Sequence, residues 1–209
     1  MYKIAVFVSG RGSNLKSIEA EIKHGNLNAE ISLIVSNKEC EALEFAKSVN
    51  IPFYIVSSCN AEGTIDYNKL IKKLLRINID LIVLAGFIKK IPIELIRTFK
   101  NKIINIHPAL LPSFGGKGMY GMNVHRAVFN SSAKVSGPTV HFVDEIYDNG
   151  IIISQKAVDI SDVKTPEEIA ARVLSVEHKL LPEVINLFVE GKILVTENRV
   201  FLDLGRDCD

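Results

Sequence analysis

The protein has 209 residues, of which 47% are hydrophobic and 23% are charged, and its formal net charge is +1 at pH 7. This is the composition of an ordinary globular protein with enough chain to bury a substantial core. Basic residues are scattered, and no stretch approaches the length of a membrane span, so the sequence predicts neither a nucleic acid partner nor a membrane partner.

The three cysteines, Cys40, Cys59 and Cys208, are odd in number and have no CxxC spacing. We therefore expect no disulfide framework and no metal site. The apolar run at the N-terminus is too short for a signal peptide. Together these features predict a reduced, cytoplasmic protein.

Apolar, β-branched runs alternate with helical patterns through the first half of the chain. The runs cover residues 3–8, 30–35, 52–56, 81–86 and 102–106, and the helical patterns cover residues 15–23, 41–49, 67–77 and 91–99. Strands that are apolar on both faces and separated by helices indicate a parallel sheet covered on both sides. The predicted fold class is α/β, a doubly wound, mostly parallel sheet of the Rossmann-like type, with right-handed crossovers.

The pattern changes after Pro108. Residues 113–123 are rich in glycine and predict a long loop, followed by a short helix at 124–129. Residues 137–143 and 150–158 predict a hairpin-like strand pair, and residues 192–203 predict a small hairpin. A long helix starts at "TPEE", where Thr165 caps, Pro166 takes the first helical position and Glu168 completes a capping box, and it runs to about residue 190. We predict a single domain, with a phosphate-binding half at 1–107 and an antiparallel elaboration at 108–209.

The segment "VSGRGSNL", residues 8–15, joins the first predicted strand to the first predicted helix. Gly10 and Gly12 allow a tight turn and a close backbone approach, and Ser13 and Asn14 are good helix N-caps. Backbone N–H groups at a helix start can bind an anion, so the segment predicts a phosphate site. A simple turn with a cap is the alternative. The third glycine of the dinucleotide fingerprint is replaced by Leu15, and the Gly-Lys-Ser/Thr of a P-loop is missing.

The segment "NIHPALLP", residues 105–112, follows a predicted strand at the same edge of the sheet. Asn105 and His107 are two residues apart, so both side chains point to one side of a strand. An amide can stabilise a developing oxyanion, and a histidine exchanges protons near neutral pH. Pro108 ends strand pairing directly after them. The pair predicts a catalytic centre, although a single histidine is more often structural.

A working histidine usually has a partner that sets its charge, and "DEIYDNG", residues 144–150, offers one. A carboxylate beside His107 raises the pKa of the imidazole. Spacing alone leaves both Asp148 and Asp144 open. Among the other histidines, His141 is core or site wall, His125 is a candidate for lining the cleft, and His24 and His178 are expected at the surface.

Four segments, "VFVSGRGSNL", "VLAGFIKKI", "INIHPALLPSF" and "GPTVHFVDEIYDNGIIISQKAV", together resemble the phosphoribosylglycinamide formyltransferase family. The resemblance runs from residue 1 to about 195. The Asn-x-His-Pro and Asp-x-Gly segments belong to the wider family that uses 10-formyltetrahydrofolate. The "SGRGSN" loop is specific to the glycinamide ribonucleotide branch.

The resemblance implies transfer of a formyl group from 10-formyltetrahydrofolate to the amine of glycinamide ribonucleotide, in purine (IMP) biosynthesis, without a metal. It implies Asp148 as the acid beside Asn105 and His107, and a protonated His107. The implied substrate-binding residues are Gly12, Ser13, Asn14 and Glu177, and the implied folate-binding residues are Ile88, Lys89, Lys90, Ile91, Asn105, Asp144 and Asp148. Thr64 and Leu174 stand where the family often has a basic residue and a glutamine.

The expected partners are these two small molecules, and the expected oligomeric state is a monomer or a homodimer. Three alternatives remain. A formyltetrahydrofolate hydrolase usually has an extra N-terminal domain, and a methionyl-tRNA formyltransferase has a C-terminal RNA-binding domain and a basic surface. A module that only binds a nucleotide phosphate has no need of Asn105, His107 and an acid.

Overall fold

The computed structural model describes residues 1–57 and 62–203. Cys59 and Cys208 lie outside the described residues, so the expectation for them stays a prediction, while Cys40 is a free thiol. The elements run in the order β1 (Tyr2–Val8), α1 (Ser13–Lys23), β2 (Ala29–Ser36), α2 (Glu41–Ser48), β3 (Phe53–Val56), β4 (Thr64–Ile65), α3 (Tyr67–Arg76), β5 (Leu81–Leu84), α4 (Ile93–Thr98), β6 (Ile103–His107), α5 (Met122–Asn130), β7 (Val135–Ser136), β8 (Thr139–Phe142), β9 (Ile152–Gln155), β10 (Val158–Asp159), α6 (Pro166–Val189), β11 (Ile193–Val195) and β12 (Val200–Leu202).

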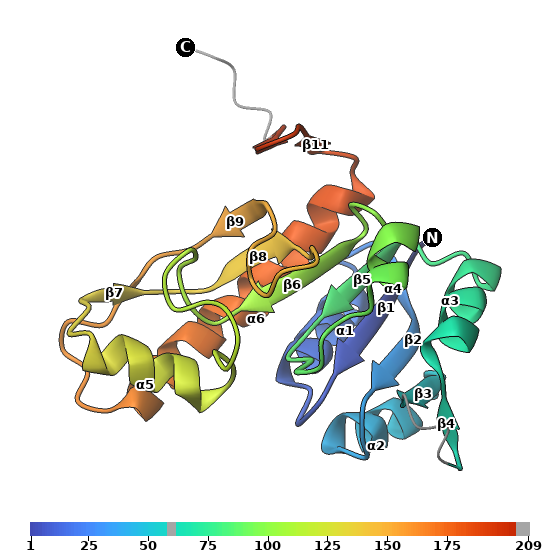
Figure 1. Ribbon diagram of the computed structural model, residues 1–209, viewed down its shortest axis with the longest axis horizontal. Helices are drawn as coiled ribbons and strands as arrows, with labels where there is room; N and C mark the ends of the chain where they lie inside the picture. Colours follow the sequence, from blue (N-terminus) through green and yellow to red (C-terminus); the bar gives the residue numbers. More distant parts are fainter. Residues whose placement is uncertain (58–61, 204–209) are drawn as a thin grey trace.

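The main sheet has eight strands in the order β4-β3-β2-β1-β5-β6-β8-β9 (Figure 1). The first six of these strands are parallel to one another, β8 is antiparallel to β6, and β9 is antiparallel to β8. The chain moves outward from β1 to β4 and then returns to β5 on the other side of β1. The strand order therefore reverses between β1 and β5, and the carboxyl ends of these strands are where doubly wound sheets bind ligands. The predicted fold class is confirmed.

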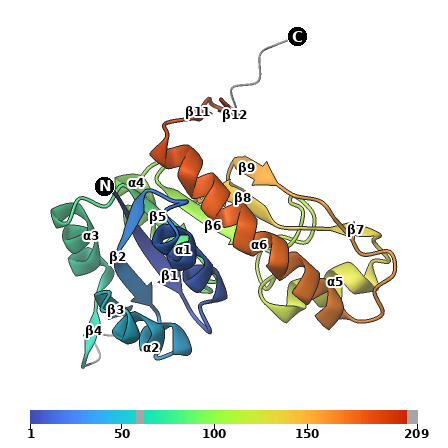
Figure 2. The same cartoon turned by 180° about the vertical axis from the view of Figure 1, so that it is seen from behind.

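Strand β1 shows how the sheet is covered on both faces. Ile4, Val6 and Val8 pack into one core cluster, with residues of α1, α2 and α6. Ala5 and Phe7 pack into a second cluster, with residues of α3 and α4. Alternating side chains of one strand thus contact opposite helical layers, as the period of two requires. Figure 2 shows the face that carries α1 and α6.

The second half of the chain follows the predicted pattern, with additions. Strands β8 and β9 are paired antiparallel, and β11 and β12 form the expected small hairpin. The backbone N–H of Glu168 donates to Oγ1 of Thr165 (3.2 Å), so Thr165 caps α6 as predicted. The Glu168 carboxylate accepts from the backbone N–H of Lys164 rather than of Thr165 (2.8 Å). The strands β4, β7 and β10 were not predicted, because two residues are too few to show a period.

A third core cluster joins α5 to α6 and surrounds the buried side chains of Val124, Val128, Ile169 and Val173. This cluster supports the segment between β6 and β8 beside the carboxyl edge of the sheet. In residues 1–57 and 62–203 no helix is long and apolar enough to cross a membrane.

Candidate functional site

Residues 8–15, the glycine segment, connect β1 to α1. Gly12 has a φ of +72°, and a Cβ added there would lie 2.8 Å from Cβ of Ala42, so the position requires glycine on two grounds. The carbonyl of Gly10 accepts from the backbone N–H of Ala42 (3.2 Å), which fixes the segment against α2. Because the first turn of a helix leaves its N–H groups without intrahelical acceptors, this segment can hold an anion.

The predicted capping role of Ser13 and Asn14 is wrong. Gly12 is the N-cap residue of α1, and no side chain caps the helix. The side chain of Asn14 is used elsewhere: its Nδ2 donates to Oε2 of Glu177 on α6 (2.7 Å). The side-chain amide of Asn14 therefore makes a tertiary contact between α1 and α6 instead of capping α1.

Glu177, which the resemblance implies as a substrate-binding residue, is 7% exposed. Burial raises the pKa of its carboxyl, and the hydrogen bond from Asn14 opposes the shift. Oδ1 of Asn14 is buried without a hydrogen-bond partner. Asn14 and Glu177 line a cavity next to residues 8–15, and the side-chain oxygen of Asn14 is there without a hydrogen-bond donor.

Ser9 joins the ends of three strands. Its hydroxyl donates to Oδ1 of Asn37, which follows β2, and accepts from the backbone N–H of Ile88, which follows β5 (3.1 Å). Sequence reasoning missed this residue, because a serine at a strand end carries no signal of such a bridge. The bridge ties the glycine segment to the predicted folate segment.

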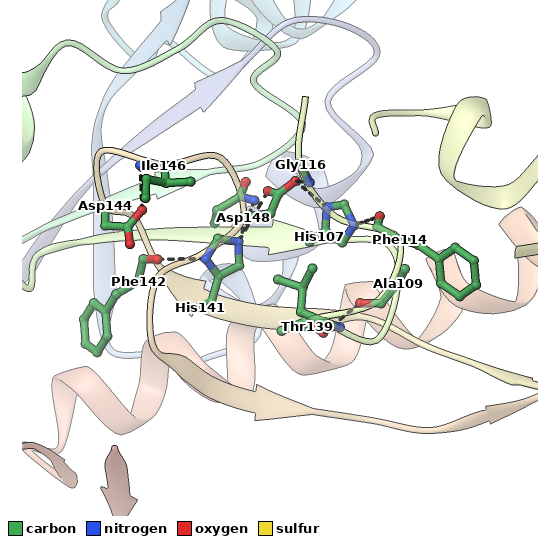
Figure 3. Close-up of polar contacts among 12 residues, drawn as sticks. His107, Ala109, Phe114, Gly116, Thr139, His141, Phe142, Asp144, Ile146 and Asp148 are labelled. Carbon is green, nitrogen blue, oxygen red and sulfur yellow. Dashed lines mark hydrogen bonds and ion pairs between the residues drawn. The ribbon is translucent and has the colours of Figure 1, made fainter. Parts of the chain in front are cut away.

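Asn105 and His107 lie at the end of β6, and both line the same cavity, as the period of two predicts. His107 is 3% exposed. Its Nε2 lies 2.9 Å from the carbonyl oxygen of Phe114, which can only accept, so Nε2 carries a hydrogen. Its Nδ1 lies 3.6 Å from Oδ2 of Asp148 (Figure 3).

Two opposing effects act on the pKa of His107, which the resemblance implies is protonated. Burial lowers the pKa of the imidazole, and the opposing effect of Asp148 is smaller. The carboxylate does raise the pKa of His107, as predicted, but not above its ordinary value. The Nε2–H of His107 thus faces the carbonyl of Phe114, while Nδ1 faces the carboxylate of Asp148.

Asp148, and not Asp144, faces His107. Oδ2 of Asp148 accepts from the backbone N–H of Gly116 (2.9 Å), and Oδ1 lies 3.7 Å from Nε2 of His141. Asp144 instead orders its own turn, since its carboxylate accepts from the backbone N–H of Ile146 (2.8 Å) and from Nδ2 of Asn149 (3.0 Å). The choice that spacing left open is decided by geometry.

Two cavities meet at these side chains. The larger has a volume of about 670 Å³, extends from the glycine segment to the 116–122 loop, and is lined by the predicted residues Gly12, Ser13, Asn14, Ile88, Asn105, His107, Asp148 and Glu177. The smaller, of about 70 Å³, is lined by the predicted residues Lys89, Lys90, Ile91, Asn105, Asp144 and Asp148. Asn105 and Asp148 line both cavities.

Two further histidines belong to the site. His125 lines the large cavity as expected, and its buried Nδ1 has no hydrogen-bond partner. His141 lines the small cavity and is 2% exposed, so it is both core and site wall. Within the part of the chain that the structure describes, no group of three or more His, Cys, Asp or Glu side chains is arranged to hold a metal ion.

Comparison with known proteins gives one consistent family. The family described as formyl transferase matches residues 2–185. The chain is 45% identical over 201 residues to the chloroplastic phosphoribosylglycinamide formyltransferase of Arabidopsis thaliana. The alignment covers 95% of this chain and 69% of that protein. The chain is 39% identical over 187 residues to the phosphoribosylglycinamide formyltransferase of Bacillus subtilis, with 88% and 93% covered.

The fold agrees with a solved structure from the same group. The glycinamide ribonucleotide transformylase 1 of Symbiobacterium toebii superposes with a TM-score of 0.87 at 31% identity, over 97% of this chain and 94% of that one.

Proposed function

The chain belongs to the formyl transferase family, and we propose that it transfers the formyl group of 10-formyltetrahydrofolate to the amine of glycinamide ribonucleotide, a step of purine biosynthesis. The products are formylglycinamide ribonucleotide and tetrahydrofolate. The names of the Arabidopsis and Bacillus relatives support this substrate.

One observation carries the proposal: Asn105 and Asp148 line both cavities. A group transfer between two small molecules needs two binding sites that meet at the reacting atoms. In the proposal the large cavity takes glycinamide ribonucleotide, with its phosphate at Gly12, Ser13 and Asn14 and its ribose at Glu177. The small cavity takes the folate ring, bordered by residues 88–91 and 144–148.

Asn105 supports the transition state. Attack of the amine on the formyl carbon forms a C–N bond and places a negative charge on the formyl oxygen. A side-chain amide that donates to this oxygen stabilises the charge in the transition state more than in the ground state. The Nδ2 of Asn105 is the donor in this assignment.

His107 and Asp148 form the second part of the centre. His107 supplies an Nε2–H, which a developing oxyanion attracts more strongly than the carbonyl of Phe114 does. Negative charge beside the ring also favours uptake of a proton at Nδ1. The carboxylate of Asp148, 3.6 Å from Nδ1, then stabilises the imidazolium.

The tetrahedral intermediate collapses when the bond between the formyl carbon and N10 of the folate breaks. The attacking nitrogen loses one proton and N10 gains one, so the transfer needs no oxidant or reductant. In this assignment His107 serves the exchange, either directly or through a water molecule.

The test is an incubation of the purified chain with both substrates, in which tetrahydrofolate is followed by absorbance and the formylated ribonucleotide by mass spectrometry. The proposal expects both products in equal amounts. Tetrahydrofolate and formate without the ribonucleotide substrate would indicate a hydrolase instead. Binding of both substrates without any product would indicate a binding module.

A further inference from the structure

His141 lies beside Asn105, one of the proposed catalytic residues. It lies on β8 directly opposite Asn105 on β6, in the antiparallel register of the two strands. Its Nδ1 is 2.7 Å from the carbonyl oxygen of Phe142 (Figure 3). Its Nε2 is 3.0 Å from Nδ2 of Asn105. The reaction proposed above assigns it no role.

The contacts of His141 determine its tautomer. A carbonyl oxygen only accepts, so Nδ1 must carry a hydrogen to bond the carbonyl of Phe142. In a neutral ring Nε2 then has a lone pair and accepts. Its partner at 3.0 Å must donate, and this selects the NH₂ group of Asn105 rather than its oxygen.

The tautomer in turn fixes the amide of Asn105. An amide turned by half a rotation would place Oδ1 against the Nε2 lone pair, and two acceptors at that distance repel each other. With Nδ2 held toward His141, one of its two hydrogens is bound and the other stays available. His141 therefore decides on which side of Asn105 the remaining donor lies.

A proton on Nε2 would reverse this arrangement, because a cationic His141 cannot accept from Asn105. Its new N–H would face Oδ1 of Asp148, 3.7 Å away. The charged and titratable groups near His141 are His107 on β6, Asp144 and Asp148 after β8, and Lys89 and Lys90 across the small cavity. Burial is the largest influence on the pKa of His141 and lowers it, which favours the neutral ring.

We propose that His141 is a positioning residue, whose Nδ1–H tautomer, fixed by the carbonyl of Phe142, orients the amide of Asn105 so that its free N–H is the oxyanion donor. The part of this proposal that concerns the reaction rests on the proposed function. The orientation itself does not. One experiment therefore tests the orientation of Asn105, and a second tests its effect on the reaction.

The first experiment reads the tautomer without activity. The chain is labelled with ¹⁵N-histidine, and its five histidines are observed by NMR at pH 7.5, with His141 assigned by its absence in His141→Gln. We expect a protonated Nδ1 and an unprotonated Nε2 for His141, and a changed Nε2 shift in Asn105→Ala. An Nε2–H tautomer or an imidazolium at this pH would overturn the proposal, whether or not the chain transfers formyl groups.

The second experiment compares His141→Leu with His141→Gln. Leucine fills the space without an acceptor, while the glutamine Oε1 reaches about as far as Nε2 and accepts from Asn105. We expect His141→Leu to lower kcat about 100-fold, as a misplaced catalytic group does, with little change in either KM. We expect His141→Gln to stay within about tenfold of wild type, the effect of one ordinary hydrogen bond.

A pH profile completes the second experiment. Wild-type kcat should fall more steeply at acid pH than that of His141→Gln, because only the wild type can protonate Nε2 and release Asn105. Equal losses in the leucine and glutamine variants, or a wild-type kcat in His141→Leu, would contradict the positioning role. If His141→Leu does not fold, the profile of His141→Gln and the NMR result still decide. A wild-type chain without formyl transfer would refute the proposed function alone.

Discussion

The backbone N–H of Gly116 donates a hydrogen bond to Oδ2 of Asp148 (2.9 Å), which ties the glycine-rich loop to the acid beside His107. The same loop contacts the ring of His107 through the carbonyl of Phe114 (2.9 Å). Because glycines 116, 118 and 121 all have positive φ, this loop follows a path that other residues adopt only with strain. The loop therefore shares hydrogen bonds with two of the proposed catalytic residues.

The two roles of Asp148 can be separated by substitution. In Asp148→Asn the amide oxygen still accepts from Gly116, but no charge faces Nδ1 of His107, so we expect kcat to fall about 100-fold while Gly116 keeps its protection. In Asp148→Gly, which also accepts the φ of +55° at this position, the acceptor is lost, and amide exchange of Gly116 should become about fivefold faster. Hydrogen exchange and steady-state kinetics measure both. Faster exchange in the asparagine variant would contradict this assignment.

Asn105 and His107 each supply a donor to the developing oxyanion in our proposal. We expect Asn105→Ala and His107→Ala each to reduce kcat about 100- to 1,000-fold, since each loses one such donor. Circular dichroism should show a folded chain in both cases. The matched control is His24→Ala, an exposed histidine far along the chain, which should keep wild-type turnover. Near wild-type kcat in either site variant would remove that residue from the mechanism.

Gly25 provides a matched control for substitution of Gly12 in the glycine segment. Both have a left-handed backbone, with φ of +72° and +76°, but an added Cβ meets Ala42 at position 12 and open space at position 25. Gly25→Ala should lose about 1 kcal/mol of unfolding free energy with unchanged kinetics. Gly12→Ala should lose more, and its KM for glycinamide ribonucleotide should rise. Urea denaturation and initial rates test this, and identical behaviour of the two variants would contradict it.

The buried carboxyl of Glu177 predicts a pH-dependent change in stability. Its pKa is raised by burial in the folded state, so the ionised form destabilises the protein above that raised pKa, and the effect disappears as pH falls toward the unfolded value. Glu177→Gln should therefore raise the free energy of unfolding at pH 8 but not at pH 4. The KM for glycinamide ribonucleotide should rise in this variant, because the carboxylate is the proposed ribose contact.

A control for Glu177 lies about 1.7 turns further along the same helix. The side chain of Glu183 is 58% exposed, so Glu183→Gln should change neither stability nor KM beyond experimental error. A stability gain at pH 4 equal to that at pH 8 would show that burial of the charge is not the cause.

His125 predicts the opposite dependence on pH. Burial and the nearby His107 lower its pKa in the folded state, so the unfolded chain takes up this proton first, and the protein loses stability as pH falls below the ordinary value of 6.5. His125→Phe removes that loss and also removes the buried Nδ1 that has no partner. Thermal unfolding at pH 8 and pH 5.5 should show a smaller difference for the variant than for wild type. An unchanged difference would exclude His125 as a source.

The sequence predicted those elements that have enough residues to show a period. Strands β1, β2 and β6 and helices α1, α3 and α6 follow their apolar patterns, and Thr165 marks the start of α6 by a local hydrogen bond. The period of two also determined that Asn105 and His107 share one side of β6. These features depend on a few neighbouring residues, which a sequence contains completely.

Other features depend on contacts between distant residues, and only the tertiary structure decided them. Asn14 pairs with Glu177, 163 residues away, instead of capping α1. Asp148 was separated from Asp144 by the fold of one loop against His107 and Gly116. The register of β6 against β8 placed His141 on Asn105, and burial set the pKa of His107 below the value that its acidic neighbour alone would give. Hydrogen-bond partners and desolvation are properties of the packed chain, whereas the longer strands and helices and the Thr165 cap follow from local sequence.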